Sequence, residues 1–381
     1  MTEREKAKFD ALPEALKPNA EFFLKKELPK LPDKLEQGKW YRNEPGNCVC
    51  ANGEPYHGCF KLGSENKLAI MFCGGGVSIN EYTAARPMSI YNEPGTDGHY
   101  FNDVFIIADA SAGATGLFKD VEENPFRNWT MLFVPYANGD FHCGTNDFPY
   151  TSIDGKKETL HHHGYKNFKN LLEFIVRHIP NPEKILVTGY SAGGFATALL
   201  TDDIMDAFPL CNDATCAVDS ALLVYDGWQS VAKEVWKTPK KIYERLTGNN
   251  LTLDSLKALR DKRGEKVKIM FISSTRDSAL VEVQNYLDNG KFIATVEGGN
   301  KYEVTLGDMC RDLAKTVGDV GLFLFDAPEE FAYLDFKLTQ HCILNSAHLF
   351  TIKTDGKNAV EWLFDGANGK LEKLGMNLLQ K

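Results

Sequence analysis

Short apolar runs alternate with amphipathic segments from about residue 67 to the end of the chain. Runs of this length are typical of strands buried on both faces. They predict strands at 68–73, 103–109, 130–135 and 185–187, and further apolar runs occupy 221–225, 267–273, 321–325 and 331–336. Helical spacing over 165–179 and a small-residue run from 192 predict helices. This alternation predicts an α/β fold, a mostly parallel sheet with helices on both faces.

The domain organisation follows from the same pattern. Residues 1–40 are charged and contain prolines at 13, 18, 29 and 32, so we expect an N-terminal arm that packs on the body. Residues 41–381 form one predicted catalytic domain. The segment 228–262 separates two apolar runs and is long for a crossover connection. It is therefore interpreted as a helical insertion that caps the functional site proposed below.

The most specific motif is Gly189-x-Ser191-x-Gly193, which lies between an apolar strand pattern and the helical run. This spacing is typical of a nucleophile elbow, where small neighbours let a strained serine project from a strand-to-helix turn. The helix that begins at Ala192 supplies free N–H groups and a partial positive charge for an oxyanion. We therefore predict that Ser191 is a catalytic nucleophile.

A serine nucleophile needs a base and an acid that orients it. Asp226, Asp277 and Asp326 each follow an apolar run downstream of Ser191. Asp277 is chosen because it lies two strands after the serine, where α/β-hydrolases carry the acid. Two histidines follow it. His348 is chosen as the base because it lies on a small-residue loop, whereas His341 belongs to an apolar run and is interpreted as packed.

An oxyanion hole needs converging backbone N–H groups. Ala192 supplies one, and the turn after the strand at 68–73, with Gly76 and Val77, supplies the others. The glycines there also suit a phosphate loop, but neither phosphate-binding glycine motif is present.

Charge and composition narrow the partners. The net charge is −9, which argues against nucleic acid and anionic membranes as partners but does not identify the substrate. The N-terminus lacks the apolar core of a secretory signal and no segment has the length of a membrane span, so a cytoplasmic protein is expected unless a leader was removed. Oligomeric state stays open.

Two clusters in the sequence contain residue types that bind metal ions. Cys48, Cys50, His57 and Cys59 lack the usual zinc spacing, and consecutive side chains of His161, His162 and His163 point in different directions. The prediction is therefore no metal and no cofactor. Nine cysteines leave at least one unpaired, although the pairs Cys48/Cys50 and Cys211/Cys216 lie close enough in sequence to oxidise.

Several segments in order along the chain resemble the pectin acetylesterase/Notum family of serine esterases. They are Cys50–His57, Phe72–Ser78, Asn124–Trp129, Val134–Asp140, Gly189–Gly194 with Asp203, and Val218–Ser220. The resemblance implies an α/β-hydrolase-like fold and an acyl-enzyme on Ser191, with Asp277 and His348 completing the triad and Gly76, Val77 and Ala192 binding the oxyanion. Val77-Ser78 stands where the family usually has Trp-Cys, and Ala137 replaces a common cysteine, so pectin is not implied as the substrate.

The sequence thus predicts a serine carboxylester hydrolase that removes short acyl groups, acetyl foremost, from a polar or carbohydrate substrate. A deacylase of longer chains or thioesters is one alternative. A non-catalytic binding protein on the same fold is the other.

Overall fold

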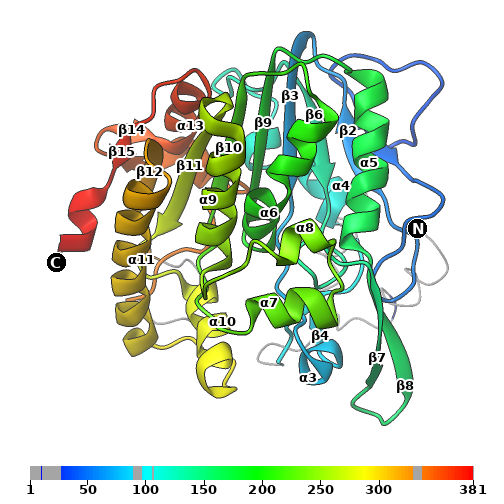
Figure 1. Cartoon of the computed structure of the whole chain (residues 1–381). Coiled ribbons are helices and arrows are strands. Elements are labelled where there is room, and N and C mark those ends of the chain that lie inside the picture. The colour runs from blue at the N-terminus through cyan, green and yellow to red at the C-terminus, as the bar shows by residue number, and fades with distance from the viewer. Residues whose placement is uncertain (1–9, 11–26, 89–96, 105–106, 329–336, 381) are drawn as a thin grey trace.

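The computed structural model describes residues 10, 27–88, 97–104, 107–328 and 337–380, and a nine-stranded sheet lies at its centre (Figure 1). In spatial order the strands are β1 (Trp40–Asn43), β2 (Gly58–Lys61), β6 (Trp129–Val134), β3 (Glu65–Phe72), β9 (Lys184–Tyr190), β10 (Ala214–Asp219), β11 (Val267–Ser274), β12 (Val320–Phe325) and β15 (Lys373–Leu374). Strands β6 to β15 run parallel, whereas β1 and β2 form an antiparallel edge. The predicted α/β fold with a mostly parallel sheet is confirmed.

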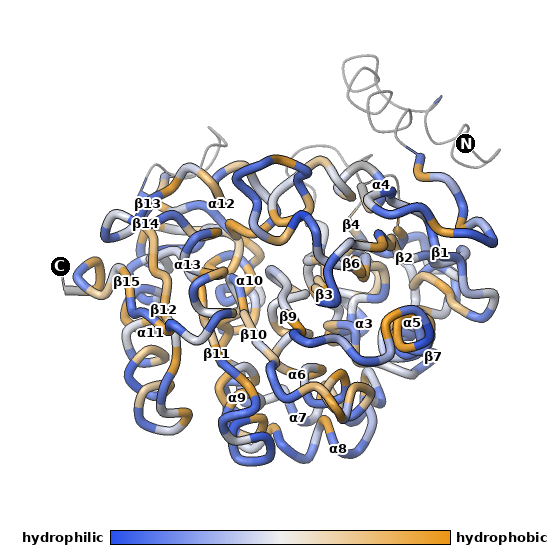
Figure 2. Tube along the Cα trace, turned by 90° about the horizontal axis from the view of Figure 1, so that it is seen from above, coloured by the Kyte–Doolittle hydropathy of each residue, from blue (hydrophilic) through white to orange (hydrophobic). Residues whose placement is uncertain are grey.

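Helices cover both faces of this sheet. One core contains buried residues of α5 (Gly164–His178), α6 (Ala192–Ala207), α9 (Leu251–Arg263) and α11 (Val296–Thr316). The core on the opposite face contains residues of α12 (His348–Thr351) and α13 (Ala359–Ala367). Strand β3 shows why: Ile70 and Phe72 enter the first core, and the alternate residues Ala69 and Met71 enter the second. Figure 2 shows this apolar interior as orange strands within bluer outer turns.

Smaller elements lie at the edges and in the connections. The helices are α3 (Glu81–Ala84), α4 (Ile107–Ser111), η1 (Gly116–Phe118), α7 (Trp228–Ser230), η2 (Val231–Val235), α8 (Lys240–Tyr243), η3 (Gly264–Lys266), α10 (Ser278–Asn289) and η4 (Met376–Gln380). The strand pairs are β4 (Pro87–Met88) with β5 (Tyr100–Phe101), β7 (Asn146–Thr151) with β8 (Lys157–His162), and β13 (Lys353–Thr354) with β14 (Lys357–Asn358).

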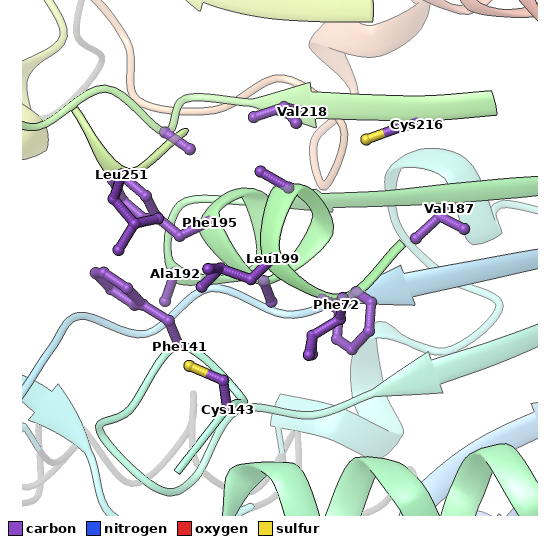
Figure 3. Close-up of a cluster of buried hydrophobic side chains, with 14 of the residues drawn as sticks. Phe72, Phe141, Cys143, Val187, Ala192, Phe195, Leu199, Cys216, Val218 and Leu251 are labelled. Atoms are coloured by element: carbon purple, nitrogen blue, oxygen red, sulfur yellow. The ribbon is translucent and has the colours of Figure 1, made fainter. Parts of the chain in front are cut away.

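Helix α6 packs against a cluster of aromatic side chains that the sequence pattern does not predict. Phe195 of this helix stacks on Phe141, with ring centroids 4.4 Å apart and an interplanar angle of 13°. Figure 3 shows the two rings face to face beside Leu251. Trp228 and Trp236 close the cluster from α7 and the turn after η2, and both are fully buried. This dense packing fixes the helix that begins immediately after Ser191.

Two of the predicted strands do not have the expected structure. The end of the 103–109 run is helix α4, because a short apolar run fits either element and Asp109 here contacts Arg42 of β1 and His57, the residue before β2. Residues 221–225 form no strand of the sheet and follow β10, which the sequence analysis did not predict. Ser220 has φ +51°, a left-handed conformation that turns the chain out of the sheet after β10. The 331–336 run lies outside the described residues.

The structure describes part of the predicted arm and all of the predicted cap segment. Within 1–40 the described part runs along β1, where Leu31 N–H donates to the Arg42 carbonyl and Leu28 N–H to Asp109. The second half of 228–262 is α9, which lies between β10 and β11 and packs on α6, as a crossover helix does. The first half holds α7, η2 and α8, and their role as a cap stays a prediction.

Candidate active site

Ser191 occupies a strained turn between β9 and α6. Its φ of +55° and ψ of −126° are rare for a residue with a side chain, and such strain is concentrated at functional sites. Its backbone N–H donates to the Asp219 carbonyl at 3.0 Å, and its own carbonyl accepts from Gly194 and Phe195. The side chain is thus held at the carboxyl edge of the sheet, as the predicted elbow requires.

Glycines around the elbow permit the close approach of three chain segments. A Cβ on Gly193 would overlap the Phe72 carbonyl oxygen, and a Cβ on Gly189 would overlap the Gly193 carbonyl. Gly74 lies so near the serine that an added Cβ would stand 2.6 Å from the Ser191 Cβ. The turn that follows β3 therefore lies directly against the nucleophile.

Asp277 lies fully buried at the end of β11, where it caps helix α10. Its Oδ1 accepts from the Leu280 N–H at 2.9 Å. The same carboxylate contacts His341, whose Nδ1 lies 2.8 Å from Oδ1 and 2.9 Å from Oδ2. An imidazole held through Nδ1 by a buried carboxylate has its tautomer fixed, with Nε2 left to exchange a proton.

The structure therefore pairs Asp277 with His341 and not with the predicted His348. His341 was interpreted as packed within the run 337–343, yet this run is a loop that pairs with the segment after β11. Thr339 donates its N–H to the Arg276 carbonyl, and its own carbonyl accepts from Ser278, both at 3.0 Å. This bridge carries His341, two residues further on, to the carboxylate.

The other candidates lie elsewhere. His348 begins α12, which packs in the core on the opposite face, and its N–H donates to the Ser346 hydroxyl at 3.2 Å. Asp226 is exposed in the turn before α7. Asp326 is exposed and accepts from the Arg276 guanidinium at 3.1 Å.

Asp219 joins the serine to the histidine loop, a role that the sequence analysis missed. Besides its carbonyl on Ser191, its Oδ2 accepts the Ile343 and Leu344 N–H groups, each at 2.9 Å. Its Oδ1 accepts from the Ser220 hydroxyl, which in turn accepts the Cys342 N–H. Burial raises the pKa of Asp219 to about 6, although these donors and the nearby His341 lower it. The only sequence signal was its place in the Val218–Ser220 segment of the family resemblance.

The predicted oxyanion donors are not equivalent in the structure. Ala192 is the first residue of α6, where N–H groups point away from the helix body. Gly76 has φ +77° and lies in the turn beside the elbow. Val77 differs, because its N–H donates to the His99 carbonyl at 2.7 Å. This bond directs the Val77 N–H to a neighbouring chain segment, so Val77 is not presented as an oxyanion donor in this conformation.

A cysteine also lies near the elbow. The Cys73 Sγ is 2.9 Å from the Tyr190 hydroxyl, and burial raises the Cys73 pKa to about 11. A thiol with such a pKa stays protonated at neutral pH and is a poor nucleophile. His142, fully buried, contacts the Cys73 carbonyl at 2.9 Å, and burial lowers the pKa of His142 to about 4. Ser191 is therefore the candidate nucleophile of this cluster.

The cysteine cluster near the N-terminus forms an ion-pair site. His57 Nε2 lies 2.9 Å from Asp109 Oδ1, and the Arg42 guanidinium binds the other carboxylate oxygen. Burial raises the Asp109 pKa, but His57 and Arg42 lower it more, and the net shift is downward. Cys59 lies beside them, whereas Cys50 donates to the Pro55 carbonyl. All nine cysteines are described, and no disulfide joins any two of them.

A cavity of about 530 Å³ lies near the elbow and is lined by residues of the β7–β8 hairpin, β4–β5 and the 51–52 turn. Tyr100, one of its walls, pairs with Gly76. Ser191 is not among the described residues that line this cavity.

A comparison with known families finds a match for part of the chain. A family model described as pectinacetylesterase matches residues 106–274, a span that contains Ser191 and Asp219 and ends just before Asp277. No curated protein matches the chain. None of the helices in the described part of the chain is long and apolar enough to cross a membrane.

Proposed function

We infer from the match over residues 106–274 that this chain is an ester hydrolase of the pectin acetylesterase family, and we propose how it carries out that reaction. The proposed reaction removes a short acyl group, acetyl foremost, from a polar or carbohydrate substrate through an acyl-enzyme. Ser191 is the nucleophile, His341 the general base and Asp277 the residue that orients it. His341 takes the role that sequence reasoning gave to His348.

The reaction has two stages, acylation and then deacylation of Ser191. The Ser191 oxygen attacks the ester carbonyl carbon while His341 Nε2 accepts its proton. The imidazolium then protonates the leaving alcohol as the ester C–O bond breaks. Water, deprotonated by His341, attacks the acyl-serine, and the released serine oxygen takes the proton back. Asp277 stabilises the imidazolium at both stages.

The oxyanion of each tetrahedral intermediate would be bound by the Ala192 N–H and by an N–H of the glycine turn, with Gly76 kept as a candidate. Val77 joins this hole only if its hydrogen bond to His99 opens when the substrate binds.

The single observation that carries the proposal is the pairing of a buried Asp277 with His341 at the same sheet edge as the strained Ser191. Asp219 supports it, because one residue bonds both the serine backbone and the loop of the histidine. A binding protein would not need a strained serine beside an acid–histidine pair.

Hydrolysis of p-nitrophenyl acetate by the full chain tests the proposal. We expect Ser191→Ala to lose activity by about 10⁴- to 10⁶-fold, while Ser64→Ala, at an exposed serine, keeps it. A fluorophosphonate probe should label the wild type and Ser64→Ala but not Ser191→Ala. Unchanged turnover in Ser191→Ala, with an unaltered circular dichroism spectrum, would refute the proposal. A series of acyl lengths and a thioester then separates short-chain deacylation from its alternatives.

A further inference from the structure

Two histidines and an aspartate meet at the base of the β7–β8 hairpin, outside the proposed catalytic machinery. Asp147 Oδ1 lies 2.6 Å from His161 Nδ1 and 2.8 Å from His163 Nε2. The two imidazole centroids are 5.3 Å apart. One candidate ligand atom from each residue lies within 4.8 Å of the other two. In Figure 1 the hairpin is the green ribbon that extends below helix α5.

The local fold explains why the three side chains converge. Asp147 and His161 are direct partners in the antiparallel ladder. Alternation along β8 sends His162 the opposite way, where it is fully buried and its Nδ1 bonds the Asn138 carbonyl. His163 then lies on the same side as His161, as the residue that precedes α5. The sequence-based expectation that consecutive histidines point in different directions is correct for His162. It did not take into account that His161 and His163, two residues apart, lie on the same side.

We propose that Asp147, His161 and His163 form a binding site for a divalent transition-metal ion, with zinc as its representative. Two imidazoles and a carboxylate are ligands that zinc accepts, at about 2.0–2.2 Å each. Such bonds place ligand atoms roughly 3 to 3.5 Å apart in a tetrahedron, slightly further than Asp147 lies from each histidine now. Small side-chain rotations therefore admit the ion.

The site is open to solvent on one side. The Asp147 side chain is 60% exposed, that of His161 30% and that of His163 14%. A fourth position is thus available to water or another small ligand. The bound ion would tie β7, β8 and the start of α5 together, and residues of β7 and β8 also line the cavity.

Substitution of Lys166 tests the site, because the proposal predicts the direction in which the metal affinity changes. Its Nζ lies 3.0 Å from His163 Nε2, so the ammonium group occupies the lone pair that the metal needs. A cation there also repels a divalent ion. The metal must displace Lys166, and removal of the ammonium should therefore strengthen binding.

Zinc binding to the full chain, purified without a histidine tag and treated with a chelator, can be measured by isothermal titration calorimetry. We expect one site in the wild type. His161→Ala and Asp147→Asn should each weaken binding by at least about tenfold, since even loss of a residue that only supports a metal ligand costs about 10- to 100-fold. Lys166→Met should tighten it. His178→Ala, at an exposed histidine of α5, should leave it unchanged.

Three results would overturn the site. One is no zinc binding by the wild type at millimolar concentration. Another is equal binding by the wild type, His161→Ala and Asp147→Asn, which would locate the ion elsewhere, for example at His57, Cys59 and Asp109. The third is weaker binding by Lys166→Met. This last variant removes an exposed side chain and creates no cavity, so it answers the question even if a ligand variant unfolds.

Discussion

The elbow at Ser191 and the loop that carries His341 sit at the same sheet edge but are held in different ways. The elbow is fixed by its own neighbours: β9 before it, α6 after it, and glycines that let the chain turn. The histidine loop contains little regular structure. It is fixed by contacts with residues far away in sequence, at Asp219 and Arg276.

This difference shows where the site is robust and where it is fragile. Packing of α6 on Phe141 and the neighbouring strands holds the serine, so most single changes nearby leave the turn in place. The position of the histidine depends on a few hydrogen bonds to the buried Asp219 carboxylate and on two β-bridges of Thr339, with Asp277 and Pro328. Loss of one of these can misplace the base without unfolding the sheet.

The largest expected effect separates the two histidines of the loop. His341→Ala should lower kcat for p-nitrophenyl acetate by about 10⁴- to 10⁶-fold, because the proton acceptor is lost. His348→Ala should stay within a few-fold, since His348 begins a helix that packs in the opposite core. Steady-state kinetics on both variants decide the matter. The reverse order of effects would restore His348 as the base.

Next comes a change that breaks the elbow itself. Gly193→Ala places a methyl group against the Phe72 carbonyl, a backbone atom that cannot move away cheaply. We expect a loss of about 3 kcal/mol in the free energy of unfolding, measured by urea denaturation. Gly46→Ala is the matched control, because nothing lies within 4 Å of its added Cβ. Equal stability of the two variants would show that the elbow is not closely packed.

A third prediction concerns Asp219, the link between the two regions. Asp219→Ala leaves the Ile343 and Leu344 N–H groups without their acceptor, so the His341 loop should shift. A displacement of about 1 Å can lower kcat by about 100-fold, with a smaller change in KM. Asp219→Asn keeps one acceptor oxygen and should recover most of the activity. If both variants lose activity equally while staying folded, the negative charge rather than the hydrogen bonds is what matters.

The smallest effect is the pH dependence that Asp219 adds to stability. Its folded pKa of about 6 lies above the ordinary value of 3.8, so its protonation favours the folded state. The resulting stabilisation is fully present below pH 3.8 and is lost as the pH rises through 6. The wild type should therefore lose stability relative to Asp219→Asn across that window, by at most about 1.4 kcal/mol per pH unit.

Urea titrations of both proteins at matched pH values cancel the contributions of other buried groups, such as Asp140 and His142. A difference between the two proteins that does not change from pH 4 to 7 would contradict the raised pKa of Asp219.

Much of the fold could be predicted because the pattern is local. Parallel strands that are buried on both faces are continuous apolar runs, so β3, β6, β9, β11 and β12 were anticipated. Strand β10 was missed because Ala214–Asp219 mixes small and polar residues. The prediction of a strand at 103–109 was wrong, because apolar content alone does not distinguish a short strand from a short helix.

The sequence by itself determined the parallel α/β fold and the strained position of Ser191, because both depend on periodicity and on neighbours within a few residues. Tertiary structure decided which histidine meets Asp277, since the loop from 337 to 346 is shaped by hydrogen bonds to β10 and β11, more than 60 residues away. It also decided that Val77 bonds His99 and that His161 and His163 share a face with Asp147. Such pairings depend on distances between segments, which no pattern along the chain encodes.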